Sequence, residues 1–130
     1  MRGLLDTSVL IAVEGGRRLN EDRLPAESAI SVITLAELHA GALVAGDVET
    51  RARRMATVQA VSDVELIPID GDAALVWARM RVHLAGAGRR VNVNDLWIAA
   101  SAVANDLPVV TQDVDFDAVE GVAGLKVIRV

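Results

Sequence analysis

The chain has 130 residues, of which 52% are hydrophobic and 24% charged. This length predicts one domain spanning residues 1–130, and the composition excludes a disordered chain. The absence of cysteine excludes disulfides and thiolate metal sites. The net charge of −5 argues against a nucleic-acid partner. However, Lys126 is the only lysine, and arginine suits phosphate; genomic composition explains the arginine preference equally well.

The first half of the chain alternates strand-like and helix-like segments. A polar stretch that reaches Pro25 predicts a loop, and Asp47 predicts a helix cap. In the helix after Asp47, Val48, Ala52 and Met55 share one face and predict an inward-facing stripe. The expected elements are a strand at 2–5, a helix at 7–13, a strand at 29–32 and helices at 34–45 and 48–61.

The second half continues the alternation. Pro68, in the apolar run 65–69, predicts an edge position or a strand end, because proline cannot donate to a strand ladder. A helix at 94–105 is apolar on all sides, which predicts burial, and strands at 109–110 and 127–128 follow it. A helix at 71–85 carries apolar residues at core spacing, namely Ala73, Val76, Trp77, Met80 and Leu84.

Strands that alternate with helices in this way predict an α/β fold, with a central, mostly parallel sheet flanked by helices on both faces. No apolar run approaches the roughly 20 residues needed to cross a bilayer. No signal peptide is visible either. We therefore expect a cytoplasmic protein with no membrane partner.

Four acidic residues follow strands or begin helices. Asp6 and Asp113 fall at the carboxyl ends of predicted strands, Glu37 lies one short turn after the second strand, and Asp95 opens a helix. Ligands of parallel sheets bind beyond the carboxyl ends of the strands, so we expect these four carboxylates to meet there. Carboxylates repel one another, and hard oxygen ligands without cysteine predict bound Mg²⁺ or Mn²⁺.

Each acid also has a structural explanation, so the prediction depends on the combination. Thr34 and Glu37 match a capping box, in which the glutamate reaches back to a backbone amide. The other three acids fit ordinary caps and turns: Asp6 as an N-cap, Asp95 in a first turn after the N-cap Asn94, and Asp113 as a turn residue.

Several neighbouring residues are candidates for supporting roles. Ser8 and Thr111 carry hydroxyls close to the acids, where they would orient a ligand or water. Asp115 is a candidate fifth carboxylate, whereas Asp117 is better explained as a solvated loop residue. The segment 86–90, Gly-Ala-Gly-Arg-Arg, is too short and poorly placed to form a backbone phosphate-binding loop.

Four segments together resemble the PIN-domain ribonucleases, in particular the VapC-like toxins of bacterial toxin–antitoxin pairs. The resemblance spans essentially the whole chain, and no acid of the pattern is missing. It implies a metal-dependent endoribonuclease with the acids at 6, 37, 95 and 113 around Mg²⁺ or Mn²⁺. The matching segments, in the family's order, are Leu4–Ile11, Ile33–Leu38, Asn94–Ala100 and Val110–Phe116.

The resemblance also implies partners and roles. It implies a homodimer, an RNA substrate such as tRNA or rRNA, and a small antitoxin encoded by the neighbouring gene. Asp6 and Asp95 are the expected direct metal ligands, with Glu37 and Asp113 acting through water or holding a second ion. Leu43, Leu38 and Val44 would offer a groove to an amphipathic segment of the antitoxin, or else would pack the core or a homodimer contact.

Three other functions remain open at this point. A phospho-aspartyl receiver usually has an acidic pair after its first strand and a lysine after its last core strand, and both are absent here. A haloacid-dehalogenase-like phosphatase would have aspartate at position 8, where this chain has Ser8. A catalytically silent PIN-fold binding module is the third, although no acid has been lost.

Overall fold

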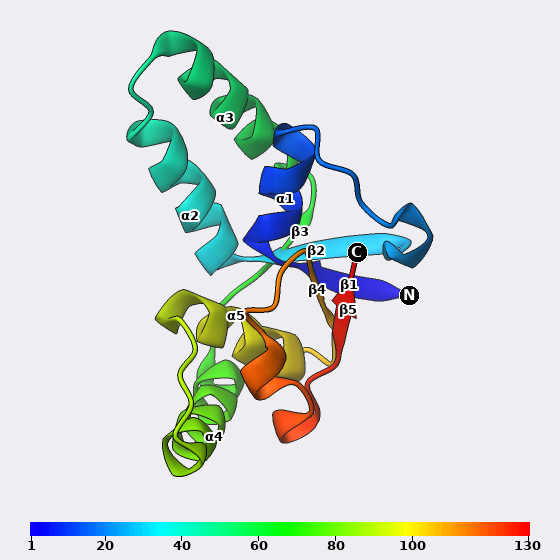
Figure 1. The fold of residues 1–130 in the computed structure, drawn as a ribbon, viewed down its shortest axis with the longest axis vertical. Helices are drawn as coiled ribbons and strands as arrows, with labels where there is room; N and C mark the ends of the chain where they lie inside the picture. The colour runs from blue at the N-terminus through cyan, green and yellow to red at the C-terminus, as the bar shows by residue number, and fades with distance from the viewer.

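A fully parallel, five-stranded sheet divides the molecule into two helical layers (Figure 1). The computed structural model describes residues 1–130. The strand order is β3-β2-β1-β4-β5, so the predicted strand before Pro68 does lie at an edge. The strands are β1 (Arg2–Leu5), β2 (Glu27–Ser31), β3 (Glu65–Ile67), β4 (Val109–Thr111) and β5 (Val127–Arg129).

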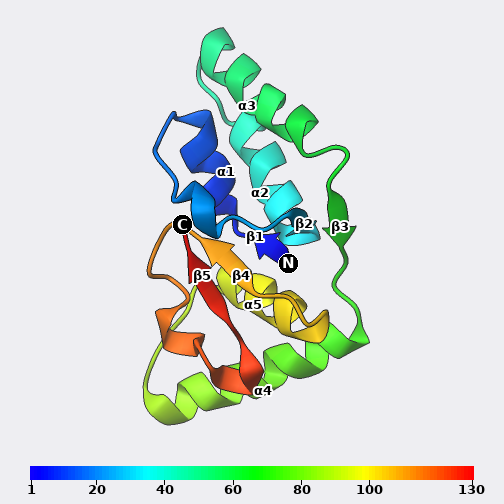
Figure 2. The same ribbon diagram turned by 90° about the vertical axis from the view of Figure 1, so that its right-hand side faces the viewer.

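Helices cover both faces of this sheet, as predicted. Figures 1 and 2 both place α1, α2 and α3 on one side of the sheet and α4 and α5 on the other. No helix combines the length and hydrophobicity needed to cross a membrane. The helices are α1 (Thr7–Glu14), α2 (Val32–Leu43), α3 (Val48–Ala60), α4 (Gly71–Ala87) and α5 (Val93–Ala104), with unpredicted 3₁₀ turns at Glu21–Arg23, Asp117–Val119 and Val122–Gly124.

The main hydrophobic core lies between the sheet and the α4–α5 layer. Met80 and Leu84 of α4 and Ile98 of α5 are buried in it, which confirms the α4 stripe and the burial of α5. Trp77 is only partly buried, and its ring stacks on that of Trp97 with centroids 4.9 Å apart. A smaller cluster of Ile30, Leu38 and Val61 lies under the other layer. The two cores hold the strands, and therefore their carboxyl ends, in a fixed arrangement.

Helices α2 and α5 begin two residues and one residue earlier than predicted, respectively. Helix α2 begins at Val32, and its N-cap is Ser31, whose hydroxyl accepts a hydrogen bond from the amide of Ile33 at 3.0 Å. The capping box at Thr34 and Glu37 therefore does not form, because both residues lie beyond the first positions of the helix. Asn92, not Asn94, caps α5. Asp6 and Asp47 cap α1 and α3 as predicted.

The inward face predicted for α3 is also wrong. Val48 is 85% exposed, and α3 has no buried residue. The side chain of Arg54 on the same helix donates to the carbonyl of Gly41 in α2 at 2.6 Å. The physical reason is that the α2–α3 hairpin projects away from the sheet, so no core lies beneath most of α3 (Figure 1).

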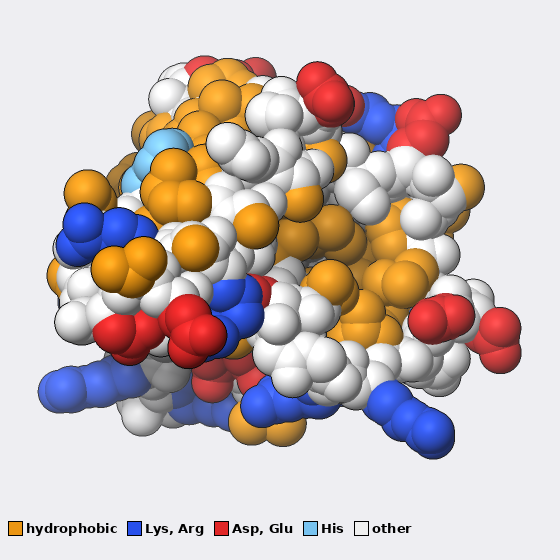
Figure 3. Space-filling model, turned by 90° about the horizontal axis from the view of Figure 1, so that it is seen from above, with side chains coloured by type: hydrophobic (Ala, Val, Ile, Leu, Met, Phe, Trp, Pro, Cys, Tyr) orange, Lys and Arg blue, Asp and Glu red, His pale blue; other side chains and the backbone are white.

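The tip of this hairpin exposes apolar side chains. Leu43 and Val44 are 75% and 77% exposed, whereas Leu38, predicted with them as part of a groove, is buried. Seen from above this layer, hydrophobic side chains cover much of the surface, and lysine or arginine side chains project along one border (Figure 3).

Candidate active site

The sheet brings the four acidic residues to one edge. Strand β1 pairs with β2 on one side and with β4 on the other, with Leu5 opposite Val110. Asp6 immediately follows β1, and its amide donates to the Val110 carbonyl at 2.8 Å. Asp113 lies two residues beyond β4, Glu37 lies in the second turn of α2, and Asp95 lies in the first turn of α5. The topology predicted from the sequence therefore places all four acids beyond the carboxyl ends of the central strands.

Two hydroxyl groups hold the carboxylate of Asp6. This side chain is 3% exposed, and its Oδ2 accepts from Ser8 Oγ at 2.6 Å and from Thr111 Oγ1 at 3.1 Å. Thr111 Oγ1 also lies 3.2 Å from Asp113 Oδ1, so one hydroxyl connects two of the acids. Ser8 Oγ in turn accepts from the amide of Gln112 at 3.1 Å. Ser8 and Thr111 therefore hold the Asp6 carboxylate, while their predicted role in orienting a ligand or water stays a prediction.

Glu37 is held by side chains from two other helices. Its Oε1 accepts from Thr7 Oγ1 at 2.8 Å, and its Oε2 lies 3.5 Å from the Asn94 side-chain amide. Thr7 Oγ1 lies 3.0 Å from the buried hydroxyl of Thr34. Sequence reasoning missed Thr7 and Asn94 in this role and assigned Thr34 to a cap. The only signal in the sequence for this role is that each residue is next to a predicted site acid, Thr7 to Asp6 and Asn94 to Asp95.

Burial and mutual repulsion both raise the pKa values of acids in this cluster. Burial raises the pKa of Asp95 from 3.8 to about 7, and the charges of Asp6, Asp115, Glu37 and Asp113 add to this effect. Burial also raises the pKa of Asp6; the charge of Asp113 adds to the rise, and the Ser8 and Thr111 hydrogen bonds oppose it. The pKa of Asp115 is raised by desolvation and by Asp113. The cluster therefore carries more negative charge than its own donors offset.

This donor set fits a hydrated, hard divalent cation. All ligand atoms are carboxylate or hydroxyl oxygens, and His39 and His83 are both exposed. No three acidic or histidine side chains lie close enough to enclose an ion by themselves. Mg²⁺ keeps several waters and takes one or two carboxylates directly, so it does not need such an enclosure. Asp117 remains outside the cluster, because it pairs with Arg129.

Two cavities reach the acids. The first, of about 470 Å³, contains Asp95 and Asp115 in its wall together with Arg89 and Arg90. The second, of about 290 Å³, lies between α1, α2 and α3 and includes Glu37. A polymer can therefore approach the cluster along the surface without any opening of the fold.

We expect the metal-free protein to lose stability as pH rises from about 4 to about 7. The folded state binds the Asp95 proton more tightly than the unfolded state does, so the free energy of unfolding falls across this window. Asp95→Asn should flatten this slope and be the more stable protein at pH about 8. Denaturant titrations in chelator at several pH values measure this. The control is Asp63→Asn, which removes an exposed acid that forms no ion pair. If the free energy of unfolding depended on pH equally in wild type and in Asp95→Asn, the prediction would be contradicted.

Comparison with known proteins agrees with this geometry. The PIN domain family matches residues 3–122. The chain is 55% identical to Ribonuclease VapC5 of Mycobacterium tuberculosis over 128 residues, covering 98% of this chain and 95% of that protein. It is 42% identical to Ribonuclease VapC4 of the same organism over 122 residues, covering 93% of each.

Solved structures show the same similarity. The crystal structure of VapBC-5, from the VapBC family of toxin–antitoxin systems of Mycobacterium tuberculosis, matches with a TM-score of 0.93 and 52% identity, covering 99% of this chain and 98% of that one. DNA-bound VapBC from Salmonella typhimurium matches with a TM-score of 0.79 and 27% identity, covering 98% and 96%. The chain belongs to the PIN domain family and is a relative of the VapC ribonucleases.

Proposed function

We propose that this chain is a Mg²⁺- or Mn²⁺-dependent endoribonuclease that acts as the toxin of a toxin–antitoxin pair. The observation that carries the proposal is the convergence of Asp6, Glu37, Asp95 and Asp113 beyond the carboxyl ends of the strands. Burial raises the pKa of Asp95 to about 7, and the charges of Asp6, Glu37 and Asp113 add to this rise. The ribonuclease names of the relatives and the VapBC titles of the structural matches support the same activity.

The residues of the cluster take distinct roles in this proposal. Asp6 and Asp95 hold the cation directly, and Glu37 and Asp113 act through its waters or hold a second ion. A divalent cation bound there supplies a water of lowered pKa and offsets charge on the phosphate. Ser8 and Thr111 orient the Asp6 carboxylate through their hydrogen bonds. Asp115 contributes further negative charge from the exposed rim of the cavity.

The family match disfavours the receiver and phosphatase alternatives, since their marker residues are also absent. The remaining alternative is a PIN module that binds without turnover. All four acids are present and gathered, which favours an enzyme. Metal-dependent cleavage of RNA separates these two functions directly.

Partners follow from the same proposal. The solved matches are VapBC toxin–antitoxin assemblies, so we propose a small cognate antitoxin, and we retain the homodimer and the cytoplasmic location as expectations. An antitoxin arginine inserted among the four acids would replace the charge of the cation and form bidentate bonds to carboxylate. The exposed Leu43 and Val44 at the tip of the α2–α3 hairpin offer apolar contacts for an amphipathic segment.

Purified chain free of antitoxin should cleave RNA with Mg²⁺ or Mn²⁺ and stop in chelator. Asp6→Asn and Asp95→Asn should each reduce the cleavage rate by orders of magnitude, because each removes a charge that the cation needs. Both variants should remain folded, since the substitution relieves repulsion. Gel assays of cleavage beside thermal unfolding measure this, with Asp63→Asn as the control; undiminished cleavage in excess chelator would rule the mechanism out.

Substitutions of Glu37 and Ser31 should have opposite effects on RNA cleavage and on stability. Glu37→Gln keeps an oxygen that can accept from Thr7 but loses the charge, so its free energy of unfolding should stay within about 1 kcal/mol of wild type while cleavage is lost. Ser31→Ala removes the observed N-cap and should cost about 1 kcal/mol while cleavage persists. Full activity of Glu37→Gln would leave a three-acid site.

Expression of the chain alone should slow bacterial growth, and coexpression with the neighbouring small gene should restore it. The two proteins should copurify, because the antitoxin occludes the acidic cluster. The Asp95→Asn variant is the control: it should be harmless alone and still bind the antitoxin. Harmless overexpression of cleavage-competent wild type would count against the toxin role and leave the nuclease role intact.

A further inference from the structure

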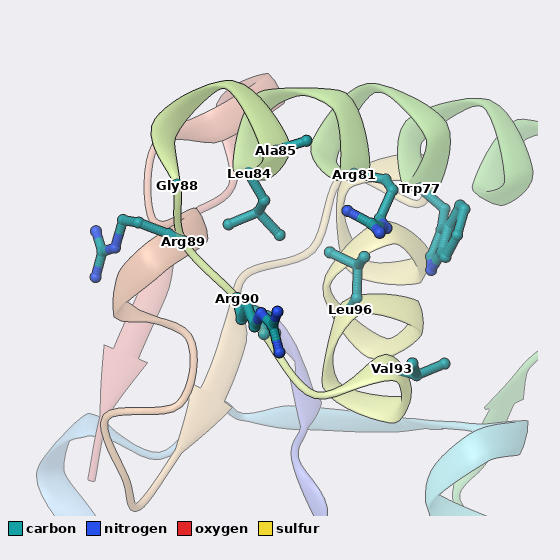
Figure 4. Close-up of a pocket in the computed structure, with 10 residues that line it drawn as sticks. Trp77, Arg81, Leu84, Ala85, Gly88, Arg89, Arg90, Val93 and Leu96 are labelled. Atoms are coloured by element: carbon teal, nitrogen blue, oxygen red, sulfur yellow. The ribbon is translucent and has the colours of Figure 1, made fainter.

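A third cavity lies between α4 and α5, beside the acidic cluster, and is larger than the two that reach the acids. Its volume is about 530 Å³, and its charged lining residues are Arg81, Arg89 and Arg90 (Figure 4). No acidic side chain lines it. By contrast, the basic residues that line four other cavities share each of them with an acid, as where Arg54 lies with Glu37. This cavity is therefore a local excess of positive charge on a chain of net charge −5.

The end of α4 fixes the arginines around this cavity. Gly88 adopts φ +66°, a conformation that glycine takes without strain, and its amide donates to the Ala85 carbonyl at 3.3 Å. The amide of Arg89 then donates to the Leu84 carbonyl at 3.0 Å, which completes a Schellman motif. Figure 4 shows the Arg81 and Arg90 side chains on opposite sides of Leu96, with Arg89 extending away from them.

All polar side chains of the cavity are hydrogen-bond donors without acceptor capacity. The side chains of the three arginines form no ion pair and no hydrogen bond with protein groups. The indole Nε1 of Trp77, which also lines the cavity, is buried and has no partner. Arginine and indole N–H groups can be satisfied only by acceptors. The ligand that matches this donor set supplies several acceptor oxygens and negative charge, which is the chemistry of phosphate.

The α4–α5 cavity shares part of its wall with the cavity of about 470 Å³ that contains Asp95 and Asp115. Arg89, Arg90 and Val91 line both, and the second contains Asp95 and Asp115. A nucleic-acid strand whose reacting phosphate lies at the acids therefore has neighbouring phosphates within reach of the arginines. The acids repel such a strand before a cation binds, so a nearby positive site is needed to hold it.

We propose that the α4–α5 cavity is a phosphate subsite, in which Arg81 and Arg90 bind the backbone of the RNA strand adjacent to the cleaved bond. The proposal rests on the ribonuclease function proposed above. The subsite contacts phosphate and not base edges, so it positions the strand without selecting a sequence.

The test is equilibrium binding of a fluorescein-labelled single-stranded RNA to the full chain in chelator, measured by anisotropy over a series of salt concentrations. The subsite variant is Arg81→Gln with Arg90→Gln. The matched control is Arg23→Gln with Arg79→Gln, which removes the same charge from two exposed arginines that form no ion pair. Thermal unfolding of both variants verifies that they fold.

We expect the subsite variant to bind RNA about tenfold or more weakly than the control. Its slope of log K against log salt should be shallower by about 1.4, because each lost phosphate contact on a single strand contributes about 0.7. Equal affinity and slope in the two variants would overturn the proposal. So would unchanged RNA binding together with lost binding of polyglutamate, since the cavity would then serve an acidic protein segment.

Cleavage by wild type in Mg²⁺, measured separately, distinguishes the two proposals. If wild type cleaves RNA but both double variants bind RNA alike, only the subsite is wrong. If wild type binds RNA through Arg81 and Arg90 but never cleaves it, the subsite stands and the ribonuclease function is wrong.

Discussion

Repulsion between carboxylates at the carboxyl edge of the sheet is the constraint on which the rest of this site depends. The three adjacent strands β2, β1 and β4 end side by side, so the residues that follow them lie close together. Asp6 is buried there against two hydroxyls, and Asp95 keeps its proton up to pH about 7. The protein offsets this repulsion only partly, through Ser8 and Thr111. In the proposed function, a divalent cation would complete the site, because it would supply the positive charge that the chain does not.

The same constraint explains the surroundings of the cluster. A cluster that repels phosphate can act on RNA only if the strand is held from nearby, and the loop after Gly88 places arginines beside it. Rigid elements set both parts: the Schellman motif ends α4, and Asn92 begins α5 three residues before Asp95. The arginine cavity and the acidic cluster are therefore separated only by the short loop between α4 and α5. An RNA strand that crosses this loop would contact both.

Much of the fold and of the candidate site could be predicted from the sequence, because both depend on long-range alternation. Strand–helix alternation fixes parallel pairing, and parallel pairing brings Asp6 and Asp113 to one edge. Predictions from local sequence were wrong where a residue suits two kinds of secondary structure. Val32 and Ile33 suit a strand by their β-branched side chains, so the sequence pattern places the start of α2 at Thr34, two residues late. The late start is also what makes a capping box between Thr34 and Glu37 look like an alternative to the predicted site role of Glu37. The α3 stripe was wrong because periodicity indicates a face but not whether a core lies beneath it.

Other features could not be predicted because they depend on side-chain contacts between distant segments. The support of Glu37 by Thr7 and Asn94 joins three helices, and neither partner has a distinctive local pattern. The arginine cavity needs Arg81 and Arg90 on opposite sides of Leu96, an arrangement set by the packing of α4 on α5 (Figure 4). The sequence indicated only that the glycines before Arg89 do not form a backbone phosphate loop.

The central claim is that these carboxylates form one site whose repulsion a divalent cation relieves. The most direct test is the unfolding temperature of wild type, Asp95→Asn and Asp63→Asn at pH about 8 as Mg²⁺ is added. Wild type and Asp63→Asn should gain about 2.7 kcal/mol of stability at a hundredfold excess of Mg²⁺ over Kd. Asp95→Asn should begin more stable than wild type and gain little. Equal gains in all three proteins, or none in wild type, would contradict the account.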